Sequence, residues 1–231
     1  MLDGQRIVCI APCYNELHKI DQVVQRVKAV SCVDEIVVVD DGSTDGSPDT
    51  ARALGATVIS LGRMQGVGAA IRAGIEYAIQ NNFDIVVIIA GNNKDEPREI
   101  ERLVMPIVRD GYDFVQGSRF LNGGGFSGMP FYRVIATRLH PLLFSLITGT
   151  WVTESTNGFR AFRTSLFKDK RINLWQTWLD AYELEPYLYY KVVKLGYKTT
   201  EVPVTKRYPP KQLGYTKMKP LIGWWSILRP L

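Results

Sequence analysis

The sequence lacks a run of about 18 apolar residues, the length expected of a helix that spans a membrane. Its beginning, MLDGQRIVCIAP, has no basic region followed by a long apolar stretch and a cleavage site, so no secretory signal is visible. Cysteine is scarce: Cys9, Cys13 and Cys32 are odd in number and have no close metal-ligand neighbours. We therefore expect a cytoplasmic protein with reduced, packed thiols and without a zinc site.

Acidic residues are absent after Glu201. Six cations follow that residue: Lys206, Arg207, Lys211, Lys217, Lys219 and Arg229. They exceed the net charge of +5, so the basic character belongs to this end of the chain. A nucleic-acid-binding protein usually spreads such charge along a groove or helix face, so we expect no nucleic-acid partner. Contact with phosphates or anionic lipid fits better, and a solvated basic end is the alternative.

Residues 220–231, PLIGWWSILRPL, are apolar and rich in tryptophan. Tryptophan beside cations is typical of a segment that lies at a membrane surface. We therefore expect residues 206–231 to make a peripheral membrane contact without crossing the bilayer.

Apolar strands alternate with amphipathic helices through the first half of the chain. We predict strands at residues 6–11, 35–40, 56–61, 84–90 and 114–117, and helices at 16–30, 50–54, 66–81 and 97–108. In the second half we predict a mobile glycine-rich loop at 122–130, helices at 133–147 and 184–195, a strand at 157–162 and an extended segment at 199–204. This pattern predicts one α/β domain, with a mostly parallel sheet flanked by helices on both faces.

Three polar segments follow the first, second and fourth strands: PCYNE, DDGSTDG and GNNKDEP. In a parallel sheet these loops meet at the carboxyl edge, where ligands bind. Asp40 and Asp41 suit hydrogen bonds from a base or a ribose, and a turn with a helix cap is the alternative. Pro12 and Tyr14 offer a flat wall for a base, and Glu16 offers a carboxylate for ribose, unless it only starts a helix.

Gly66 and Gly68 follow the third strand but lack the GxGxxG spacing of a dinucleotide fold, and no suitable acid follows about 20 residues later. NAD is therefore not expected. The glycines either approach a ligand or allow close packing of the helix that they begin.

Taken together, PCYNE, VVVDDGSTDGS, QGVGAA, GSRF, TNGFRAFR, TEVPV and GYTKM resemble family 2 glycosyltransferases in order and approximate spacing. The resemblance is to the branch of dolichyl-phosphate mannosyltransferases and polyprenyl-phosphate sugar synthases, and it runs through nearly the whole chain. It implies a GT-A fold, a nucleotide-sugar donor and inversion at the anomeric carbon. It also implies a donor-binding half at 1–119, an acceptor half at 120–205 and a tail at 206–231, with a lipid phosphate or glycolipid as acceptor.

The resemblance assigns roles to individual residues. It makes Pro12, Tyr14, Glu16 and Asp40 donor contacts, with Asp41 beside them. Near the phosphates it indicates Arg119, Arg133, Arg138 and Arg160, and in the closing loop Lys217. A guanidinium group can bind two phosphate oxygens at once and stabilise a leaving diphosphate, although each of these arginines could instead belong to a structural ion pair.

The segment AGNNKDEP departs from the family at its metal site. Ala90 and Asn92 stand where the resemblance places two aspartates, and Lys94 adds a cation nearby. Neutral amides are poor ligands for Mg²⁺ or Mn²⁺. Three interpretations stay open: Lys94 and the arginines replace the metal while Asn92 and Asn93 bind sugar or phosphate, Asp95 or Glu96 holds a metal, or the protein binds a donor without catalysis.

The acceptor decides whether a general base is needed. The oxygen of a lipid phosphate is already anionic, so alignment with the anomeric carbon suffices. A saccharide or glycolipid hydroxyl would require a carboxylate, for which Glu154 is the candidate, with a structural ion pair as the alternative.

Overall fold

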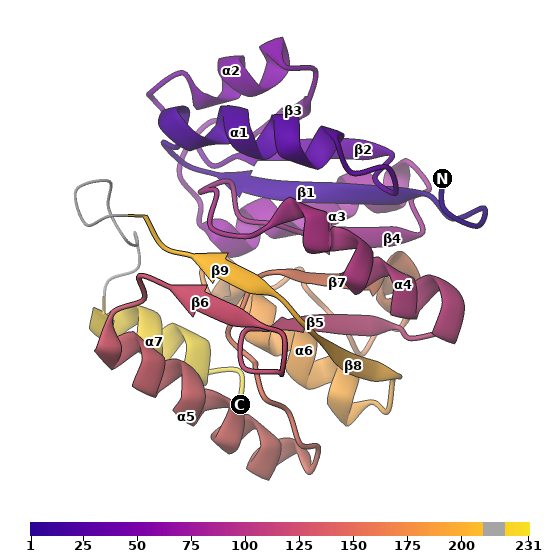
Figure 1. Cartoon of the computed structure of the whole chain (residues 1–231), viewed down its shortest axis with the longest axis vertical. Coiled ribbons are helices and arrows are strands. Elements are labelled where there is room, and N and C mark those ends of the chain that lie inside the picture. Colours follow the sequence, from indigo (N-terminus) through magenta and orange to yellow (C-terminus); the bar gives the residue numbers. More distant parts are fainter. Residues whose placement is uncertain (210–219) are drawn as a thin grey trace.

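The computed structural model describes residues 1–209 and 220–231. Its main sheet has seven strands in the order β3-β2-β1-β4-β7-β5-β8 (Figure 1). The strands are β1 (Ile7–Cys13), β2 (Glu35–Asp40), β3 (Thr57–Ser60), β4 (Ile85–Ile88), β5 (Phe114–Ser118), β7 (Arg160–Arg163) and β8 (Thr199–Pro203). Every pairing is parallel except those of β7, which runs antiparallel to both β4 and β5. Strands from both halves of the chain therefore share one sheet.

Helices cover both faces of this sheet. The helices are α1 (Leu17–Lys28), α2 (Ser47–Ala53), α3 (Val67–Gln80), α4 (Ile100–Asp110), α5 (Phe131–Thr148), α6 (Leu184–Lys194) and α7 (Pro220–Leu228), with short 3-10 turns at Pro97–Glu99, Thr164–Lys168 and Thr177–Leu179. Alternate residues of β1 face opposite sides: Ile7 and Cys9 pack with α1 and α4, whereas Val8 and Ile10 pack with α3 and α6. The long apolar strand runs in the sequence thus reflect burial on both faces.

Two expectations for the second half are corrected. The segment predicted as a mobile glycine-rich loop contains β6 (Gly125–Ser127), which pairs in parallel with β9 (Thr205–Arg207) as a second small sheet. Such pairing joins residues about 80 positions apart, so no local pattern reveals it. Strand β7 begins at Arg160 rather than at Asn157, because the Asn157 side chain donates to the Gly117 carbonyl (3.0 Å) where a ladder bond would form.

The expectation for the thiols is confirmed, since all three cysteines are free and buried. Within residues 1–209 and 220–231, none of the helices has the length and apolarity needed to cross a bilayer.

Candidate functional site

The loops after β1, β2 and β4 meet at the carboxyl edge of the sheet, as expected. The Asn15 amide donates to Ser43 Oγ (2.9 Å), and the Thr44 amide donates to Asn15 Oδ1 (2.8 Å). Asn15 adopts a positive φ of 49°, which asparagine tolerates better than most residues. The Gly91 amide donates to the Pro12 carbonyl (3.1 Å) and brings the third loop to the first. The three segments therefore form one rim.

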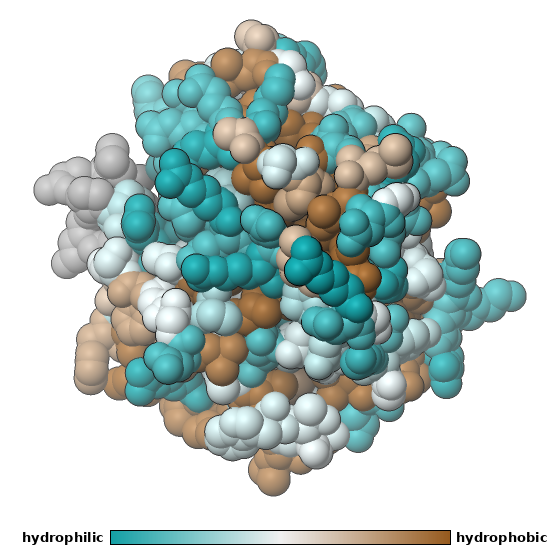
Figure 2. Space-filling view, turned by 45° about the vertical axis from the view of Figure 1, so that its right-hand side comes forward, coloured by the Kyte–Doolittle hydropathy of each residue, from teal (hydrophilic) through white to brown (hydrophobic). Residues whose placement is uncertain are grey.

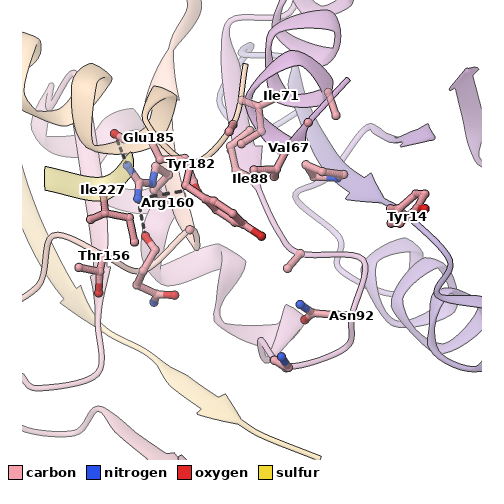
Figure 3. Close-up of a pocket in the computed structure, with 18 of the residues that line it drawn as sticks. Tyr14, Val67, Ile71, Ile88, Asn92, Thr156, Arg160, Tyr182, Glu185 and Ile227 are labelled. Atoms are coloured by element: carbon pink, nitrogen blue, oxygen red, sulfur yellow. Dashed lines mark hydrogen bonds and ion pairs between the residues drawn. The ribbon is translucent and has the colours of Figure 1, made fainter. Parts of the chain in front are cut away.

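This rim borders a cavity of about 710 Å³ that extends to the second half of the chain (Figure 3). Ten of the residues proposed from the sequence line it: Pro12, Tyr14, Glu16, Asp41, Gly66, Asn92, Lys94, Arg119, Arg133 and Arg160. Figure 3 shows Tyr182 reaching into the space between Arg160 on one side and Asn92 on the other. A cavity of this size, with charged groups among apolar side chains, suits a charged small molecule.

The two aspartates at the end of β2 have different environments. Asp40 does not line the cavity; its carboxylate accepts from the Ser43 amide (2.9 Å) and Ser60 Oγ (3.1 Å). Asp41 lines the cavity, and it accepts from the backbone amides of Gln65 (2.6 Å) and Gly66 (3.0 Å). Both therefore organise loops, and the donor contact predicted for Asp40 stays a prediction.

Gly66 and Gly68 allow a close approach of two backbone segments. A Cβ on Gly68 would lie 2.0 Å from the Leu179 carbonyl oxygen, and one on Gly66 would lie 2.3 Å from that of Asp180. The Ala69 amide donates to the Asp180 carbonyl at 3.0 Å. The contact holds the segment before Tyr182 against the first turn of α3, so the geometry favours the packing interpretation of these glycines.

Arg119 and Glu154 form a buried ion pair. Arg119 Nε lies 2.7 Å from Glu154 Oε2, and Arg119 Nη2 lies 2.6 Å from the same oxygen. Glu154 Oε1 accepts from the amide (2.9 Å) and the hydroxyl (2.8 Å) of Thr156. Glu154 is fully buried and does not line the cavity. Because both of its oxygens are engaged, the geometry favours the structural interpretation over a base that reaches an acceptor.

Arg160 crosses from β7 to the cavity wall. Its Nη1 donates to the Glu185 carbonyl (2.9 Å), its Nη2 donates to the Asn157 carbonyl (2.6 Å), and the Glu185 carboxylate lies 3.6 Å away. Burial lowers the pKa of Arg160, and the charge of Glu185 opposes this shift. Arg160 Nε is buried without a partner among the described residues, which leaves a donor for a ligand.

The loop after β4 directs its two asparagines differently. Asn92 lines the cavity, and its buried Oδ1 has no hydrogen-bond partner within the described part of the chain. Asn93 points to α1: its Oδ1 accepts from Arg26 (3.0 Å) and its Nδ2 donates to Gln22 (2.7 Å). The geometry therefore leaves Asn92 available to a ligand, whereas the Asn93 side chain holds the loop against α1.

Cations gather where the resemblance had placed a metal. Lys94 is buried, and its Nζ lies 5.1 Å from the centre of the Tyr208 ring, while the Arg133 guanidinium lies 5.6 Å from that ring. The pKa of Lys94 is lowered to about 7, chiefly by burial and then by the charges of Lys206, Arg133 and Lys19, while the charge of Glu16 opposes the shift. Arg138 does not line the cavity, and its guanidinium lies 5.2 Å from the centre of the Phe120 ring.

The two remaining carboxylates of this loop have basic partners. Asp95 Oδ1 lies 2.6 Å from Lys206 Nζ, and its other oxygen accepts from the Ala90 amide (3.3 Å). Glu96 lies 2.6 Å from Arg26 and caps the 3-10 turn by accepting from Arg98. Within the described residues, no group of three His, Cys, Asp or Glu side chains lies close enough together to hold a metal ion. This set of donors does not fit Mg²⁺ or Mn²⁺.

Among the lining residues that were not assigned to the site from the sequence are Tyr182, Glu185, Lys206 and Tyr208. Lys206 had been counted only as part of the basic tail, although β9 carries it to Asp95 and Asn157. Tyr208 accepts from Arg119 Nη1 (3.2 Å). No motif marks these positions: Lys206 and Tyr208 reach the site through the pairing of β9 with β6, and Glu185 and Tyr182 reach it from α6 and the segment before it. The prediction for Lys217 lies outside the described residues.

Comparison with known families matches residues 8–170 to "Glycosyl transferase family 2". A polyprenol monophosphomannose synthase of Mycolicibacterium smegmatis is 28% identical over 93% of this chain and 81% of its own length. A dolichyl-phosphate hexose transferase of Haloferax volcanii is 30% identical over 93% of this chain and 87% of its own length.

Among solved structures, glucosyl-3-phosphoglycerate synthase from Mycobacterium tuberculosis superimposes with a TM-score of 0.68. It is 25% identical, and the match covers 91% of this chain and 76% of that one. The same enzyme with Mn²⁺ and UDP-glucose gives a TM-score of 0.67 at 25% identity, over 90% of this chain and 73% of that one. The architecture shared with that enzyme is the GT-A fold.

Proposed function

We propose that this chain, which belongs to glycosyl transferase family 2, passes a sugar from a nucleotide diphosphate sugar to the phosphate of a polyprenyl-type lipid, with inversion. It is a glycosyltransferase of the GT-A fold. Relatives named for transfer to polyprenol and to dolichyl phosphate support this acceptor class. We treat residues 1–231 as one catalytic domain, because the sheet draws strands from both halves.

The observation that carries the proposal is the charge of the cavity wall. Six cations line it: Lys19, Lys94, Arg119, Arg133, Arg160 and Lys206. Five carboxylates oppose them: Glu16, Asp41 and Glu185 line the wall, and Glu154 and Asp95 pair with Arg119 and Lys206 from outside the lining. A reaction that joins a donor diphosphate to an acceptor phosphate brings several negative charges together, and the cations of this wall offset their repulsion.

The donor nucleoside would lie on the rim formed by the first three loops. Pro12 and Tyr14 supply a wall for the base, while Glu16 and Asp41 supply acceptors for base or ribose hydrogens. The diphosphate would then extend toward Lys94 and the arginines. This position of the donor agrees with the rule that ligands of such sheets lie beyond the carboxyl ends of the strands.

The chemistry is a single displacement. An oxygen of the acceptor phosphate attacks the anomeric carbon, its electron pair forms the new bond, and the bond to the diphosphate oxygen breaks. The nucleoside diphosphate leaves with that electron pair. The nucleophile is already anionic, so no general base is needed, and the engagement of both Glu154 oxygens supports this acceptor over a hydroxyl.

We further propose that Lys94 and Lys206 provide the charge that a divalent metal provides in the Mn²⁺-bound relative. Lys94 comes from the loop after β4 and Lys206 from β9, and both line the cavity. The bond between Lys206 and Asp95 holds the ammonium at this wall and occupies the carboxylate that could otherwise bind a metal. Asn92 adds an amide for a sugar or phosphate oxygen.

We place the reaction at the cytoplasmic face of a membrane, where a polyprenyl phosphate would present its head group. The tail from residue 206 onward would supply peripheral contact, although residues 210–219 lie outside the described structure. The basic and tryptophan-rich composition of this tail supports the proposal.

A transfer assay tests the acceptor class. Purified protein is given radiolabelled UDP- or GDP-sugars, with either a polyprenyl phosphate or the matching polyprenol, and the lipid product is counted. The proposal expects product only from the phosphate. Product from the polyprenol alone would refute it, as would donor binding without turnover on either acceptor. Arg160→Lys is the diagnostic variant, because Lys keeps the charge but loses the Nε donor that has no partner among the described residues.

A further inference from the structure

Tyr208 follows β9, and the backbone that carries it is held from two sides. Its amide donates to the Ser127 carbonyl of β6 (2.9 Å), and the preceding amide, that of Arg207, donates to the Lys94 carbonyl (2.7 Å). Strand β9 is therefore joined both to β6 and to the loop after β4. Figure 2 shows hydrophilic residues gathered across the middle of the molecule, at the height at which β9 runs in Figure 1. The place of the Tyr208 side chain thus depends on two separate segments.

Three cations surround this side chain. Lys94 Nζ lies 5.1 Å from the centre of the Tyr208 ring, and the central carbon of the Arg133 guanidinium lies 5.6 Å from it. Arg119 Nη1 donates to the Tyr208 hydroxyl at 3.2 Å. The cations come from different elements: Lys94 from the loop after β4, Arg119 from the position after β5 and Arg133 from α5. All three line the cavity, as does Tyr208.

The spacing of these cations needs a common partner, because like charges repel and no single element carries all three. A cation within about 6 Å of the centre of an aromatic ring is attracted to the ring, and more strongly where water is excluded. Tyr208 is 8% exposed and Lys94 is 7% exposed, so their contact is shielded from water. Tyr208 offers its ring to two cations and its hydroxyl oxygen to the third, whereas a phenylalanine would offer the ring alone.

We propose that Tyr208 is a positioning residue: it holds Lys94, Arg119 and Arg133 at the spacing that receives the phosphates of donor and acceptor. This inference rests on the proposed function, because that function supplies the phosphates. Charged groups that are already oriented when the substrate arrives need no reorganisation during the reaction. Without Tyr208, each binding event would have to bring the three cations together against their repulsion.

Two substitutions in the full chain separate the ring from the hydroxyl. Tyr208→Leu removes both, and it should lower kcat/KM for transfer from a UDP- or GDP-sugar to a polyprenyl phosphate by about tenfold, because two cation–π contacts are lost. Tyr208→Phe keeps the ring and loses only the bond from Arg119, so its kcat/KM should lie between those of Tyr208→Leu and the wild type. Circular dichroism confirms that each variant is folded.

Tyr112→Leu is the matched control. Lys198 Nζ lies 4.5 Å from the centre of the Tyr112 ring, and neither residue lines the cavity. The control therefore loses a contact between a tyrosine ring and a cation outside the site. Its kcat/KM should equal that of the wild type.

A double-mutant cycle shows whether Tyr208 acts through the cations. In a Lys94→Gln protein the ring has already lost one of its two cations, so Tyr208→Leu should lower kcat/KM by a smaller factor than in the wild type, about threefold. A tyrosine that only stabilises the fold would cost the same factor in both backgrounds. Equal factors would therefore overturn the proposal, as would a Tyr208→Leu protein with the kcat/KM of the wild type.

Calorimetric titration of UDP and GDP separates this inference from the proposed function. Weaker binding by Tyr208→Leu than by a wild type that itself transfers no sugar would keep the positioning role and refute the proposed function. Transfer at the same rate by the wild type and Tyr208→Leu would refute the positioning role and keep the proposed function.

Discussion

Replacing Glu154 with glutamine should destabilise the protein before it affects chemistry. The substitution keeps the shape but leaves the buried Arg119 without a counter-charge. It also sets an amide NH₂ against either the guanidinium or the Thr156 amide, because the carboxylate now accepts from both. Removing one partner of a buried ion pair costs about 3–5 kcal/mol. For a chain of this length about 2–4 °C is lost per kcal/mol, so Tm should fall by about 6–20 °C.

Calorimetry tests this prediction by comparing the Tm of the wild type with that of three variants. Asp49→Asn breaks an exposed pair with Arg52 and should cost less than about 1 kcal/mol, which makes it the control for loss of one carboxylate. Glu154→Gln combined with Arg119→Met should recover much of the lost stability, because the unpaired buried charge is gone. The double variant should still lose transfer, since its guanidinium is missing. A Glu154→Gln protein that has the Tm of the wild type but transfers no sugar would refute this reasoning and indicate that Glu154 is a general base.

Three further predictions follow from the site. Lys94, with its pKa lowered to about 7, is mostly neutral at pH 8, so donor binding at that pH should take up close to one proton and should weaken as pH rises from 6 to 8. Calorimetry in buffers of different ionisation enthalpy measures the uptake, and Lys94→Gln should abolish it; uptake that persists would assign the proton elsewhere. Gly68→Ala should lower the free energy of unfolding by about 1–3 kcal/mol and lower Tm in calorimetry, because its Cβ would meet the Leu179 carbonyl oxygen at 2.0 Å; an unchanged Tm would refute the packing role. Glu185→Gln should leave the Arg160 guanidinium less well held, so in steady-state assays kcat should fall by a larger factor than KM rises. A larger change in KM than in kcat would show that Glu185 contributes only to donor binding.

The sequence predicted the donor half of the fold well, because local signals determine it. Continuous apolar runs identify β1, β2 and β4, and the parallel arrangement brings their loops to one rim. The antiparallel β7 was located only approximately, since its start depends on the Asn157 side chain. The β6–β9 pair was missed altogether, because three-residue strands carry no periodicity of their own.

The same distinction applies to the site. Lys94 and Asn92 could be identified because they lie in the segment where the family motif places the metal-binding aspartates. Lys206 could not, since its role depends on β9 bringing it within 2.6 Å of Asp95. The apolar composition of α5 was visible in the sequence, but which of its faces is buried depends on the polar groups of Arg133 and Thr137, which only the tertiary structure orients.

The measurement that tests the central claim most directly is calorimetric titration of UDP- and GDP-sugars into wild type and Lys206→Met, with chelator and with Mg²⁺ or Mn²⁺. If Lys94 and Lys206 replace the metal, wild type binds its donor equally well in chelator, and Lys206→Met loses that binding. Wild-type binding that appears only when a divalent metal is added would contradict the account and return Asp95 or Glu96 to a metal-binding role.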